Sequence, residues 1–561
     1  MFILQKMCGI WAIFGIPDFP HHSKHAMHIS GRGPDCFRME TVPHLQNCCL
    51  LFHRLAIVDD LYGMQPMRVK KFPHLYLIYN GEIYNYKHLG EKHAFDYFTK
   101  CDGEVILHLY DAFGAEKTAL LMDGVFAFCI VDTKRKEVHL GRDTFGVRPM
   151  FTLSSLSGDG PLALCSEAKG LVPIKKELDK NGAKLHIKPF PPGHTATYTL
   201  TNVGKTTFKA LKPYTYVGKT PVFDVNVTKT PDDIHSNIRA HLTEAVKKRL
   251  MADRRIGCLL SGGLDSSLVA SLLTKLAKES GISYPIQTFS IGMDGSPDVE
   301  AARKVAAHIG SEHHEVAFTA EQGIQAIRDV IYALETYDIT TIRASVGMYL
   351  VAKYINENTD TTVVYSGEGA DELCQGYIYF HKAPSAVEAD EESRRLLKDL
   401  YYYDVLRGDR TISKHGLELR VPFLDASFTS YFLSLPPELR QPKNGVEKWV
   451  LRKSFDGTGI LPYEILWRPK EAFSDGVSSK QKGKGWFEIL QRYCHDEVTD
   501  EELSKAAELY PFSTPKTKES FYYRKVFEEF FEGQSHFIPY FWMPKWSDAT
   551  DPSARVLSHY K

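Results

Sequence analysis

The seven residues 261–267, Ser-Gly-Gly-Leu-Asp-Ser-Ser, have the residue types and spacing best suited to chemistry in this chain. A short apolar run, Ile256 to Leu260, precedes them and is typical of a buried strand. Leucines at helical spacing follow, at Leu268, Leu272 and Leu276. Between a strand and a helix, glycines let the backbone approach an anion closely, and the helix N-terminus offers unpaired N–H groups. The pattern therefore predicts a phosphate-binding loop.

The aspartate within this loop predicts a metal ion. A carboxylate such as Asp265 beside phosphate implies a cation between the two, so Mg²⁺ is expected. The alternative is an ordinary turn with a serine N-cap, which a seven-residue match disfavours. The spacing differs from the G-x-x-x-x-G-K-[ST] of a Walker A loop. It resembles the SGGxDSS loop of the ATP pyrophosphatases, which hold the pyrophosphate of ATP and cleave between its α and β phosphates.

A second loop, residues 366–372, carries three carboxylates among glycines: Glu368, Asp371 and Glu372. Strands alternate with helices around both loops, which predicts an α/β domain with a parallel, doubly wound sheet and a mostly helical C-terminal part. Ligands of such sheets bind beyond the carboxyl ends of the strands, where both loops fall. The alternative for the second loop is a solvated acidic turn. The expected strands are 256–260, 287–291, 314–318 and 362–365, and the expected helices are 234–250, 267–277, 301–309 and 321–334.

The N-terminal half is predicted to be a sheet-rich α+β domain. Turn signals such as Asn80-Gly81 and Asp123-Gly124 separate short apolar runs, and one helix is expected around 105–112. The expected strands are 10–14, 49–58, 75–79, 125–131, 138–141 and 162–165.

A cysteine close to the start of the chain, Cys8, could act as a nucleophile. At a mature N-terminus, its own α-amine, with an ordinary pKa near 8, could serve as the base. Other polar residues follow it: Arg54, Asn80-Gly81, Glu82 and Asp102. These residues also have structural interpretations: Cys8 could be a buried thiol, Arg54 a surface arginine, Asn80-Gly81 a hairpin turn and Asp102 a helix N-cap.

Taken in order, these residues resemble the class II, or N-terminal nucleophile, glutamine amidotransferases, with similarity from Cys8 to about His194. The resemblance implies an αββα sandwich that hydrolyses glutamine. It implies that the Cys8 thiolate attacks the glutamine amide and that Asn80 and Gly81 form the oxyanion hole. It also implies a set of glutamine-binding residues: Arg54, Leu55, Ala56, Ile57, Val58, Asn80, Gly81, Glu82 and Asp102.

The first residues depart from that family in two ways. The family cysteine is the first mature residue, whereas six residues and Met7 precede Cys8 here; we therefore expect a mature chain that begins at Cys8. The family usually has His-Arg-Gly-Pro-Asp, and Gly31 replaces the histidine. The segment from Ile16 to Ser30 is also shorter and richer in histidine than the family predicts.

The whole chain resembles the glutamine-hydrolysing asparagine synthetases. The resemblance rests on SGGLDSS, SGEGADEL, DITTIRAS, LELRVPFLD and RPKEAFSDG. It implies aspartate, glutamine and ATP as substrates, a β-aspartyl-AMP intermediate, and Mg²⁺ as cofactor. The implied catalytic residues are Glu368, as a base, and Lys470, which stabilises the transferring phosphorus. The implied ligand contacts are Leu259, Ser261, Gly262, Gly263, Leu264, Asp265, Ser266, Ser267, Ile291, Ser366 and Gly367 for ATP; Thr340, Thr341 and Arg343 for aspartate; and Asp265 and Asp371 for metal.

Composition limits the class of protein and its partners. A chain of 561 residues is too long to fold around a single hydrophobic core. The expected division is a glutamine amidotransferase domain at 8–198, a linker at 199–230, an asparagine synthetase domain at 231–545 and a tail at 546–561. The net charge of −1 argues against nucleic-acid binding, and no apolar run is long enough to span a membrane. Ten scattered cysteines favour a reduced, cytosolic protein. The sequence leaves a homodimer open.

Three alternatives stay open. An ammonia-dependent synthetase with a blocked glutaminase site is compatible with the residues before Cys8. A β-lactam synthetase shares both domains but lacks the nucleophilic cysteine. A non-catalytic scaffold would be free to lose Asp265, Glu368 and Asp371, which are all present.

Overall fold

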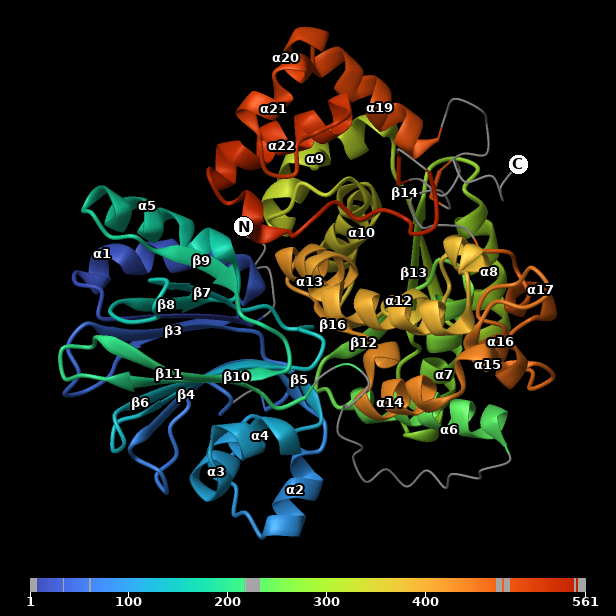
Figure 1. Cartoon of the computed structure of the whole chain (residues 1–561). Helices are drawn as coiled ribbons and strands as arrows, with labels where there is room; N and C mark the ends of the chain where they lie inside the picture. Colours follow the sequence, from blue (N-terminus) through green and yellow to red (C-terminus); the bar gives the residue numbers. More distant parts are fainter. Residues whose placement is uncertain are drawn as a thin grey trace. The chain divides into compact units, whose positions relative to one another are not determined.

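The structure is a computed structural model that describes residues 8–33, 35–59, 62–215, 217, 233–470, 477–478, 485–548 and 551–552. The chain divides into two compact units (Figure 1). The first unit combines Met1–Pro221 with two short later segments, Met251–Arg254 and Ser413–Glu418. The second unit contains Val222–Leu250, Arg255–Ile412 and Leu419–Lys561.

The first unit is built on two antiparallel sheets. One has the order β2-β3-β1-β8-β7-β9 and the other the order β11-β10-β6-β5-β4. The first sheet contains β1 (Gly9–Phe14), β2 (Cys36–Thr41), β3 (Cys48–Arg54), β7 (Phe151–Ser154), β8 (Leu162–Cys165) and β9 (His186–Pro189). The second contains β4 (Leu75–Ile83), β5 (Gly124–Asp132), β6 (Glu137–Arg142), β10 (His194–Leu200) and β11 (Thr206–Pro213).

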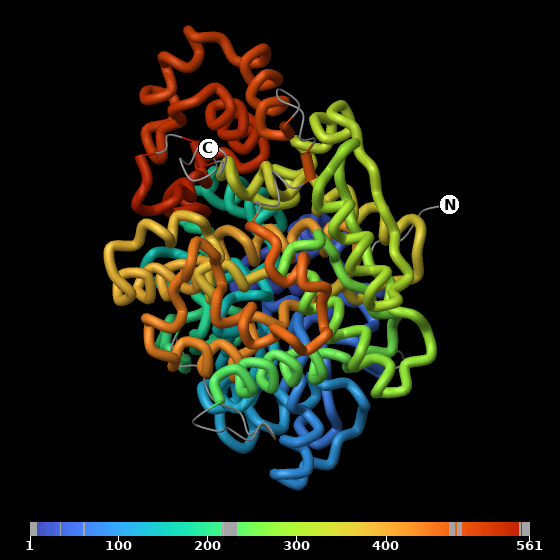
Figure 2. The backbone as a smooth tube through the Cα atoms, turned by 90° about the vertical axis from the view of Figure 1, so that its right-hand side faces the viewer, coloured from blue at the N-terminus to red at the C-terminus, as the bar shows by residue number. Residues whose placement is uncertain are grey.

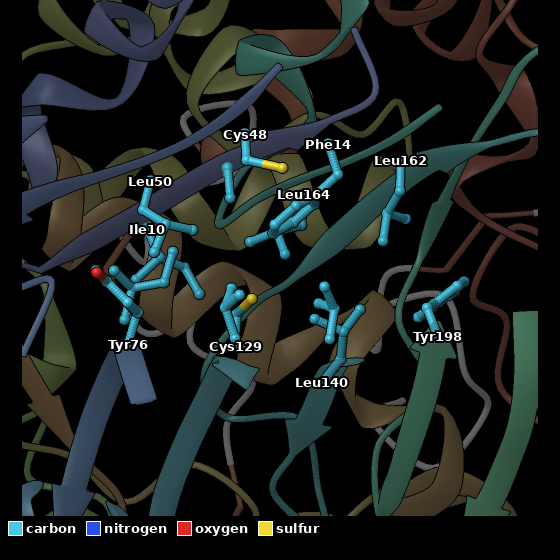
Figure 3. Close-up of a cluster of buried hydrophobic side chains, with 14 of the residues drawn as sticks. Ile10, Phe14, Cys48, Leu50, Tyr76, Cys129, Leu140, Leu162, Leu164 and Tyr198 are labelled. Atoms are coloured by element: carbon cyan, nitrogen blue, oxygen red, sulfur yellow. The ribbon is translucent and has the colours of Figure 1, made fainter. Parts of the chain in front are cut away.

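The core of this unit lies between the two sheets. Figure 3 shows side chains of one sheet, including Ile10 and Leu164, facing side chains of the other, including Cys129 and Leu140. All four are fully buried. Burial is worth roughly 25 cal/mol per Å² of apolar surface, so packing between the facing sheets stabilises the unit.

Helices cover the outer face of each sheet. The first sheet carries α1 (Phe19–Ser23), η1 (Lys24–Arg32), η2 (Ala168–Gly170) and α5 (Val172–Lys180), and the second carries α2 (Tyr86–His93), α3 (Glu104–Phe113) and α4 (Ala115–Leu121) (Figure 1). The αββα sandwich predicted from the family resemblance is therefore confirmed.

Strands β2, β7, β9 and β11 were not expected from the sequence, and the edge strands β11 and β2 show why. β11 falls in the segment expected to be a linker, yet Thr206–Pro213 pairs with β10 along its length. β2 has an almost wholly exposed burial pattern and no apolar run to mark it. Most of the remaining expected linker, residues 216 and 218–230, lies outside the described residues, as do residues 231–232 and residues 549–550 and 553–561 of the expected tail.

The second unit is built on a parallel sheet of order β14-β13-β12-β15-β16. The strands are β12 (Arg255–Leu259), β13 (Gln287–Gly292), β14 (Glu312–Ala317), β15 (Thr361–Tyr365) and the short β16 (Glu418–Arg420). The crossover helices are α7 (Leu264–Glu279), α8 (Pro297–Ile309), α9 (Ala320–Leu334) and α10 (Ile339–Asn358), with α6 (Ile234–Lys247) and η3 (Lys248–Leu250) ahead of the first strand. Parallel pairing of β12 with both β13 and β15 confirms the predicted α/β sheet.

Beyond the sheet the second unit is mostly helical, as predicted. The helices beyond β15 are α11 (Ala370–Leu373), η4 (Ile378–Lys382), α12 (Ala386–Asp399), η5 (Leu400–Tyr402), α13 (Asp404–Lys414), η6 (Pro422–Leu424), α14 (Ala426–Ser434), α15 (Pro437–Arg440), α16 (Trp449–Phe455), α17 (Tyr463–Leu466), α19 (Trp486–Glu497), α20 (Asp500–Ser504), α21 (Ala506–Leu509), α22 (Lys518–Phe531) and η7 (Ser535–Phe537). Of these, α19 to α22 gather at one end of the unit, where α22 packs against α9 (Figures 1 and 2). None of the helices that the structure describes has the length and apolar character needed to span a bilayer.

Candidate functional site

The predicted phosphate loop lies between β12 and α7. Gly262 has φ +71°, and a Cβ atom there would lie 2.5 Å from the Ala302 backbone nitrogen, so only glycine fits this turn. The Ser261 and Ser266 hydroxyl oxygens lie 3.0 Å apart, which closes the loop over the first turn of α7. The 16-residue helix α7 begins at Leu264, so its free N–H groups face the loop.

A cavity of about 220 Å³ connects this loop with the acidic loop 366–372. Both loops follow parallel strands, β12 and β15, as predicted. Of the expected ATP contacts, the cavity lining contains Leu259, Ser261, Gly263, Leu264, Asp265, Ser266, Ile291, Ser366 and Gly367. Gly262 and Ser267 are not part of that lining, because Gly262 packs against α8 and Ser267 is fully buried.

Two lysines join the carboxylates of the cavity. Lys448 Nζ lies 2.5 Å from Asp265 Oδ2 and 2.5 Å from Asp371 Oδ1, and Lys470 Nζ lies 2.6 Å from Asp371 Oδ2. Burial alone would raise the pKa of Asp371, but the ammonium groups of Lys448 and Lys470 outweigh burial and hold that pKa below its usual range. The structure therefore brings together Asp265, Asp371 and Lys470, the residues predicted for metal and phosphate.

Lys448 was missed by the sequence reasoning. It follows Glu447 immediately before α16, and its backbone has φ +56°, a left-handed conformation that a lysine adopts at some cost. Its side chain is only 2% exposed. No local pattern identifies this residue, because its partners Asp265 and Asp371 lie far away in the sequence.

We expect Lys448→Met to destabilise the unliganded protein. The change removes the Lys448 ion pair from both Asp265 and Asp371, and breaking a buried pair in this way costs about 3–5 kcal/mol. The matched control is Lys453→Met, because the Lys453–Asp456 pair is 42% and 29% exposed and is worth less than about 1 kcal/mol. Urea unfolding of both variants measures the difference; equal shifts would show that Lys448 contributes no more than a surface lysine.

Glu368 lies in the same cavity beside a buried arginine. Arg407 Nη2 of α13 lies 2.7 Å from Glu368 Oε2 and also donates to Asp404 Oδ1 at 3.1 Å. Burial raises the pKa of Glu368 to about 7 despite the attraction of Arg407, and the charges of Asp404 and Asp371 act in the same direction as burial. A carboxyl with this pKa exchanges its proton near neutral pH, as a general base must.

The expected aspartate contacts do not all reach the cavity. Thr340 lines it, and its hydroxyl is buried without a hydrogen-bond partner among the described residues. Thr341 Oγ1 instead donates to Asp338 at the start of α10. Arg343 is 3% exposed and forms bidentate pairs with Glu519 and Asp551, so it is engaged in a buried ion-pair network. Of the three, only Thr340 is brought to the cavity.

The second candidate site lies in the first unit, around Cys8. Gly9 of β1 pairs with His53 of β3, so Cys8 lies beside the loop that follows Arg54. The Leu55 backbone N–H donates to Cys8 Sγ at 3.2 Å. Burial raises the pKa of Cys8 to about 12, with a smaller contribution from the charge of Glu82. The thiol is therefore protonated at neutral pH and needs a base to become a nucleophile. The expected new N-terminus depends on residues 1–7, which lie outside the described residues.

The expected glutamine-binding loop, Leu55 to Val58, is held from both sides. Ala56 N–H donates to Asp35 Oδ2 at 3.1 Å, and Arg254 Nε donates to the Ala56 carbonyl at 2.9 Å. The Asp253 N–H donates to the Ile57 carbonyl at 2.8 Å. The guanidinium of Arg54, which is 8% exposed, donates to the Asp59 carbonyl. The segment that precedes β12 therefore helps to shape this loop, which the sequence did not indicate.

Asn80 and Gly81 lie inside β4, so the hairpin-turn interpretation is wrong. Asn80 is 2% exposed, and among the described residues its side-chain Nδ2 has no hydrogen-bond partner, although a buried polar group normally has one. Gly81 has φ +149°, and a Cβ atom there would lie 2.0 Å from the Val125 carbonyl oxygen. Any other residue would place its Cβ atom against this carbonyl, so only glycine fits at this position of β4.

Glu82 and Asp102 are both buried near this strand. The Ile83 N–H donates to Asp102 Oδ2 at 2.7 Å, and the Tyr79 hydroxyl donates to Asp102 Oδ1 at 3.1 Å. Burial raises the pKa of Asp102 to about 6. Asp102 is not a helix N-cap, because α3 begins at Glu104 with Gly103 as its cap.

Arg32 supports the backbone of the cysteine. Its Nε donates to the Cys8 carbonyl at 3.0 Å, and its Nη1 lies 2.7 Å from Glu167 Oε1. Arg32 of the Gly31-Arg32-Gly33 run therefore connects the Cys8 backbone to Glu167.

Comparison with known proteins shows the family to which the chain belongs. The family model described as Asparagine synthase matches residues 237–389 and 383–550, and the model described as Glutamine amidotransferase domain matches residues 7–206. The chain is 59% identical over 569 residues to the asparagine synthetase [glutamine-hydrolyzing] of Gallus gallus, with 99% of each chain covered. It is 57% identical over 563 residues to the protein of the same name in Homo sapiens, again with 99% of each covered. The chain therefore belongs to the glutamine-hydrolysing asparagine synthetase family.

Proposed function

We propose that this chain makes asparagine from aspartate and ATP with nitrogen taken from glutamine, and that it releases AMP, pyrophosphate and glutamate. The observation that carries the proposal is the cavity of the second unit. In it, the glycine–serine phosphate loop shares one space with Glu368, Asp371 and two lysines. Anion-binding groups and a carboxyl that titrates near neutral pH suit adenylate formation followed by proton removal.

In the first step, the aspartate β-carboxylate attacks the α-phosphorus of ATP and pyrophosphate leaves. We assign the pyrophosphate to the loop 261–267 and the adenosine part to the backbone of Leu259, Ile291 and Gly367. Lys470 stabilises the negative charge on the phosphorus. Thr340, whose hydroxyl has no partner among the described residues, is the proposed contact for aspartate.

Asp265 and Asp371 suit a bound cation. They share the Lys448 ammonium, and Asp265 Oδ1 is buried without a hydrogen-bond partner among the described residues. Carboxylate oxygens are the ligands that Mg²⁺ prefers. Bound Mg²⁺ supplies charge neutralisation at the transferring phosphate.

In the second step, ammonia attacks the carbonyl carbon of β-aspartyl-AMP, and the C–O bond to AMP breaks. The attacking nitrogen loses a proton, which we assign to Glu368. Arg407 holds this carboxylate in place.

We assign ammonia release to the first unit. The Cys8 sulfur attacks the glutamine amide to form a thioester, and ammonia leaves; water then releases glutamate. Asn80 Nδ2 and the Gly81 N–H donate to the oxyanion, a contribution of roughly 10²–10³ in rate for each donor. Arg54, Glu82 and Asp102 hold the α-carboxylate and α-amine of glutamine. We also place the chain in a reducing, cytosolic compartment, which suits ten cysteines that form no disulfide among the described residues.

The products test this proposal directly. With aspartate, glutamine, ATP and Mg²⁺, we expect one AMP and one pyrophosphate for each asparagine, because the phosphate loop holds the leaving pyrophosphate. Nucleotide chromatography with a pyrophosphate assay measures both. Formation of ADP and phosphate in the same stoichiometry would contradict the proposal.

The raised pKa of Glu368 also predicts a pH dependence of stability. This pKa rises from an ordinary 4.5 to about 7, because burial disfavours the charge. The folded protein therefore keeps a proton between these values that the unfolded chain loses. Relative to Glu368→Gln, wild-type stability should fall as pH rises from about 4.5 to 7 and level off above that. Urea unfolding of both proteins from pH 5 to 8 measures the trend, and parallel curves would contradict it.

A further inference from the structure

The histidine-rich segment of the first unit gathers around one carboxylate. His21 and His22 lie on α1 and His25 on η1, while Glu177 comes from α5, more than 150 residues further along the chain. His21 Nε2 lies 3.0 Å and His22 Nδ1 3.4 Å from Glu177 Oε2, and His25 Nε2 lies 3.3 Å from Glu177 Oε1. Neither synthesis nor glutamine hydrolysis uses these side chains.

Three of these ligand atoms have the spacing of a metal site. The potential ligand atoms of His21, His22 and Glu177 all lie within 4.8 Å of one another. In a tetrahedral site with bonds of 2.0–2.1 Å, two ligands lie about 3.4 Å apart, close to the separations of Glu177 from the two imidazoles. A small rotation of the exposed His21 ring would complete the arrangement, since that side chain is 45% exposed.

A second observation also points to a ligand. The His22 side chain is 8% exposed, and its Nδ1 has no hydrogen-bond partner among the described residues although it points at Glu177. A buried polar atom in this state normally has a partner. Burial lowers the pKa of His22 and of His25, in keeping with neutral imidazoles, the form that binds metals.

The charged neighbours do not block a cation. Lys24 Nζ lies 3.2 Å from His21 Nε2, but Lys24 is exposed and can turn into solvent. Asp18 precedes α1, and its negative charge raises the pKa of His22, so it also favours a cation at this place. His28 stacks on His25 with ring centroids 6.1 Å apart.

We propose that His21, His22 and Glu177 bind a transition-metal ion of the Zn²⁺ class, with His25 or water as the fourth ligand. Two imidazoles and one carboxylate suit Zn²⁺, Co²⁺ or Ni²⁺ and discriminate against Mg²⁺, which prefers oxygen ligands alone. The site is therefore separate in chemistry from the carboxylates of the ATP cavity.

The bound ion would fasten α1 to α5. The ion would also help to fix the position of Cys8, because η1 continues from α1 to Arg32, whose guanidinium donates to the Cys8 carbonyl. The ion acts on the reaction only by holding this segment, so its ligands are positioning residues rather than catalytic ones.

Metal titration of the full-length protein tests the site. We expect one equivalent of Zn²⁺ to bind the metal-free wild type at pH 7.5 and to raise its unfolding temperature, because the ion binds only the folded site. Affinity should fall at least tenfold in Glu177→Gln and in the double variant His21→Gln/His22→Gln. The control His88→Gln removes an exposed histidine of α2 and should bind as wild type does.

Co²⁺ titration and a fold check make the result unambiguous. Co²⁺ should give the visible spectrum of a four-coordinate nitrogen and oxygen site, without the charge-transfer band of a thiolate such as exposed Cys36. Retained ammonia-dependent synthesis in each variant shows that the chain still folds. Unchanged Zn²⁺ affinity in Glu177→Gln or in the double variant would overturn the proposal, as would a thiolate band.

Discussion

Replacing Cys8 with alanine is expected to abolish glutamine hydrolysis, by at least about 10³-fold, while ammonia-dependent synthesis of asparagine continues. The sulfur is the proposed nucleophile, and Asn80 and Gly81 alone cannot supply a covalent intermediate. The ATP cavity belongs to the other unit and keeps all of its residues. Glutamate release and asparagine formation, each measured with glutamine and with ammonium, separate the two activities.

The matched control is Cys36→Ala, because Cys36 is an exposed cysteine on β2 of the same unit. It should keep both activities.

A second comparison concerns the base that deprotonates Cys8. Burial raises the pKa of the Cys8 thiol to about 12, so we expect glutamine hydrolysis to require a free α-amine at Cys8. Protein that keeps Met1 yet hydrolyses glutamine at the full rate would contradict that role of the α-amine. It would leave the synthetase proposal intact. Protein with a free Cys8 that fails to hydrolyse glutamine would favour the ammonia-dependent alternative.

Glu368→Gln is expected to lower asparagine formation by roughly 10²–10⁴-fold with either nitrogen source, because a general base contributes on that scale. The substitution keeps the size of the side chain and removes the carboxylate that pairs with Arg407. Glutamine hydrolysis by Cys8 should persist. Aspartate-dependent exchange of labelled pyrophosphate into ATP should also persist, because adenylate formation precedes the step assigned to Glu368.

The control for Glu368 is Glu391→Gln, an exposed glutamate on α12, which should behave as wild type. Two results would remove Glu368 from the proposed role. One is asparagine formation in Glu368→Gln at near the wild-type rate. The other is loss of pyrophosphate exchange together with synthesis, which would place Glu368 in the first step instead.

Features set by neighbouring residues were predictable from the sequence. A strand, glycines and a helix within about 25 residues specify the phosphate loop, and the structure places Ser261, Gly262 and α7 as that pattern requires. The parallel sheet followed from alternating periodicities in the same way. The acidic loop was found because its three carboxylates lie together in the chain.

Features set by distant partners were not predictable. Lys448 reaches Asp265 across 183 residues, and nothing around it distinguishes it from a surface lysine. Arg343 was expected to bind substrate, but Glu519 lies 176 residues away in sequence and pairs with it. β11 is rich in lysine and threonine because it is an exposed edge strand, and that composition also suits a linker. In each example the structure is determined by a contact with another segment of the chain, and the order of the residues does not reveal that contact.

The division of the chain into units has a consequence for its modularity. The amidotransferase unit is not contiguous: Met251–Arg254 and Ser413–Glu418 belong to it, although both are encoded within the synthetase half. Glu418 lies 3.5 Å from the Nη2 atom of Arg148, which is 1% exposed, and Asp253 accepts a hydrogen bond from the Asp59 N–H. A fragment that stops at residue 221 would lose both of these contacts. A gene fusion that grafts this glutaminase onto another enzyme would therefore need to carry both short segments with it, so the two halves can be exchanged in evolution or in the laboratory only as an interleaved pair.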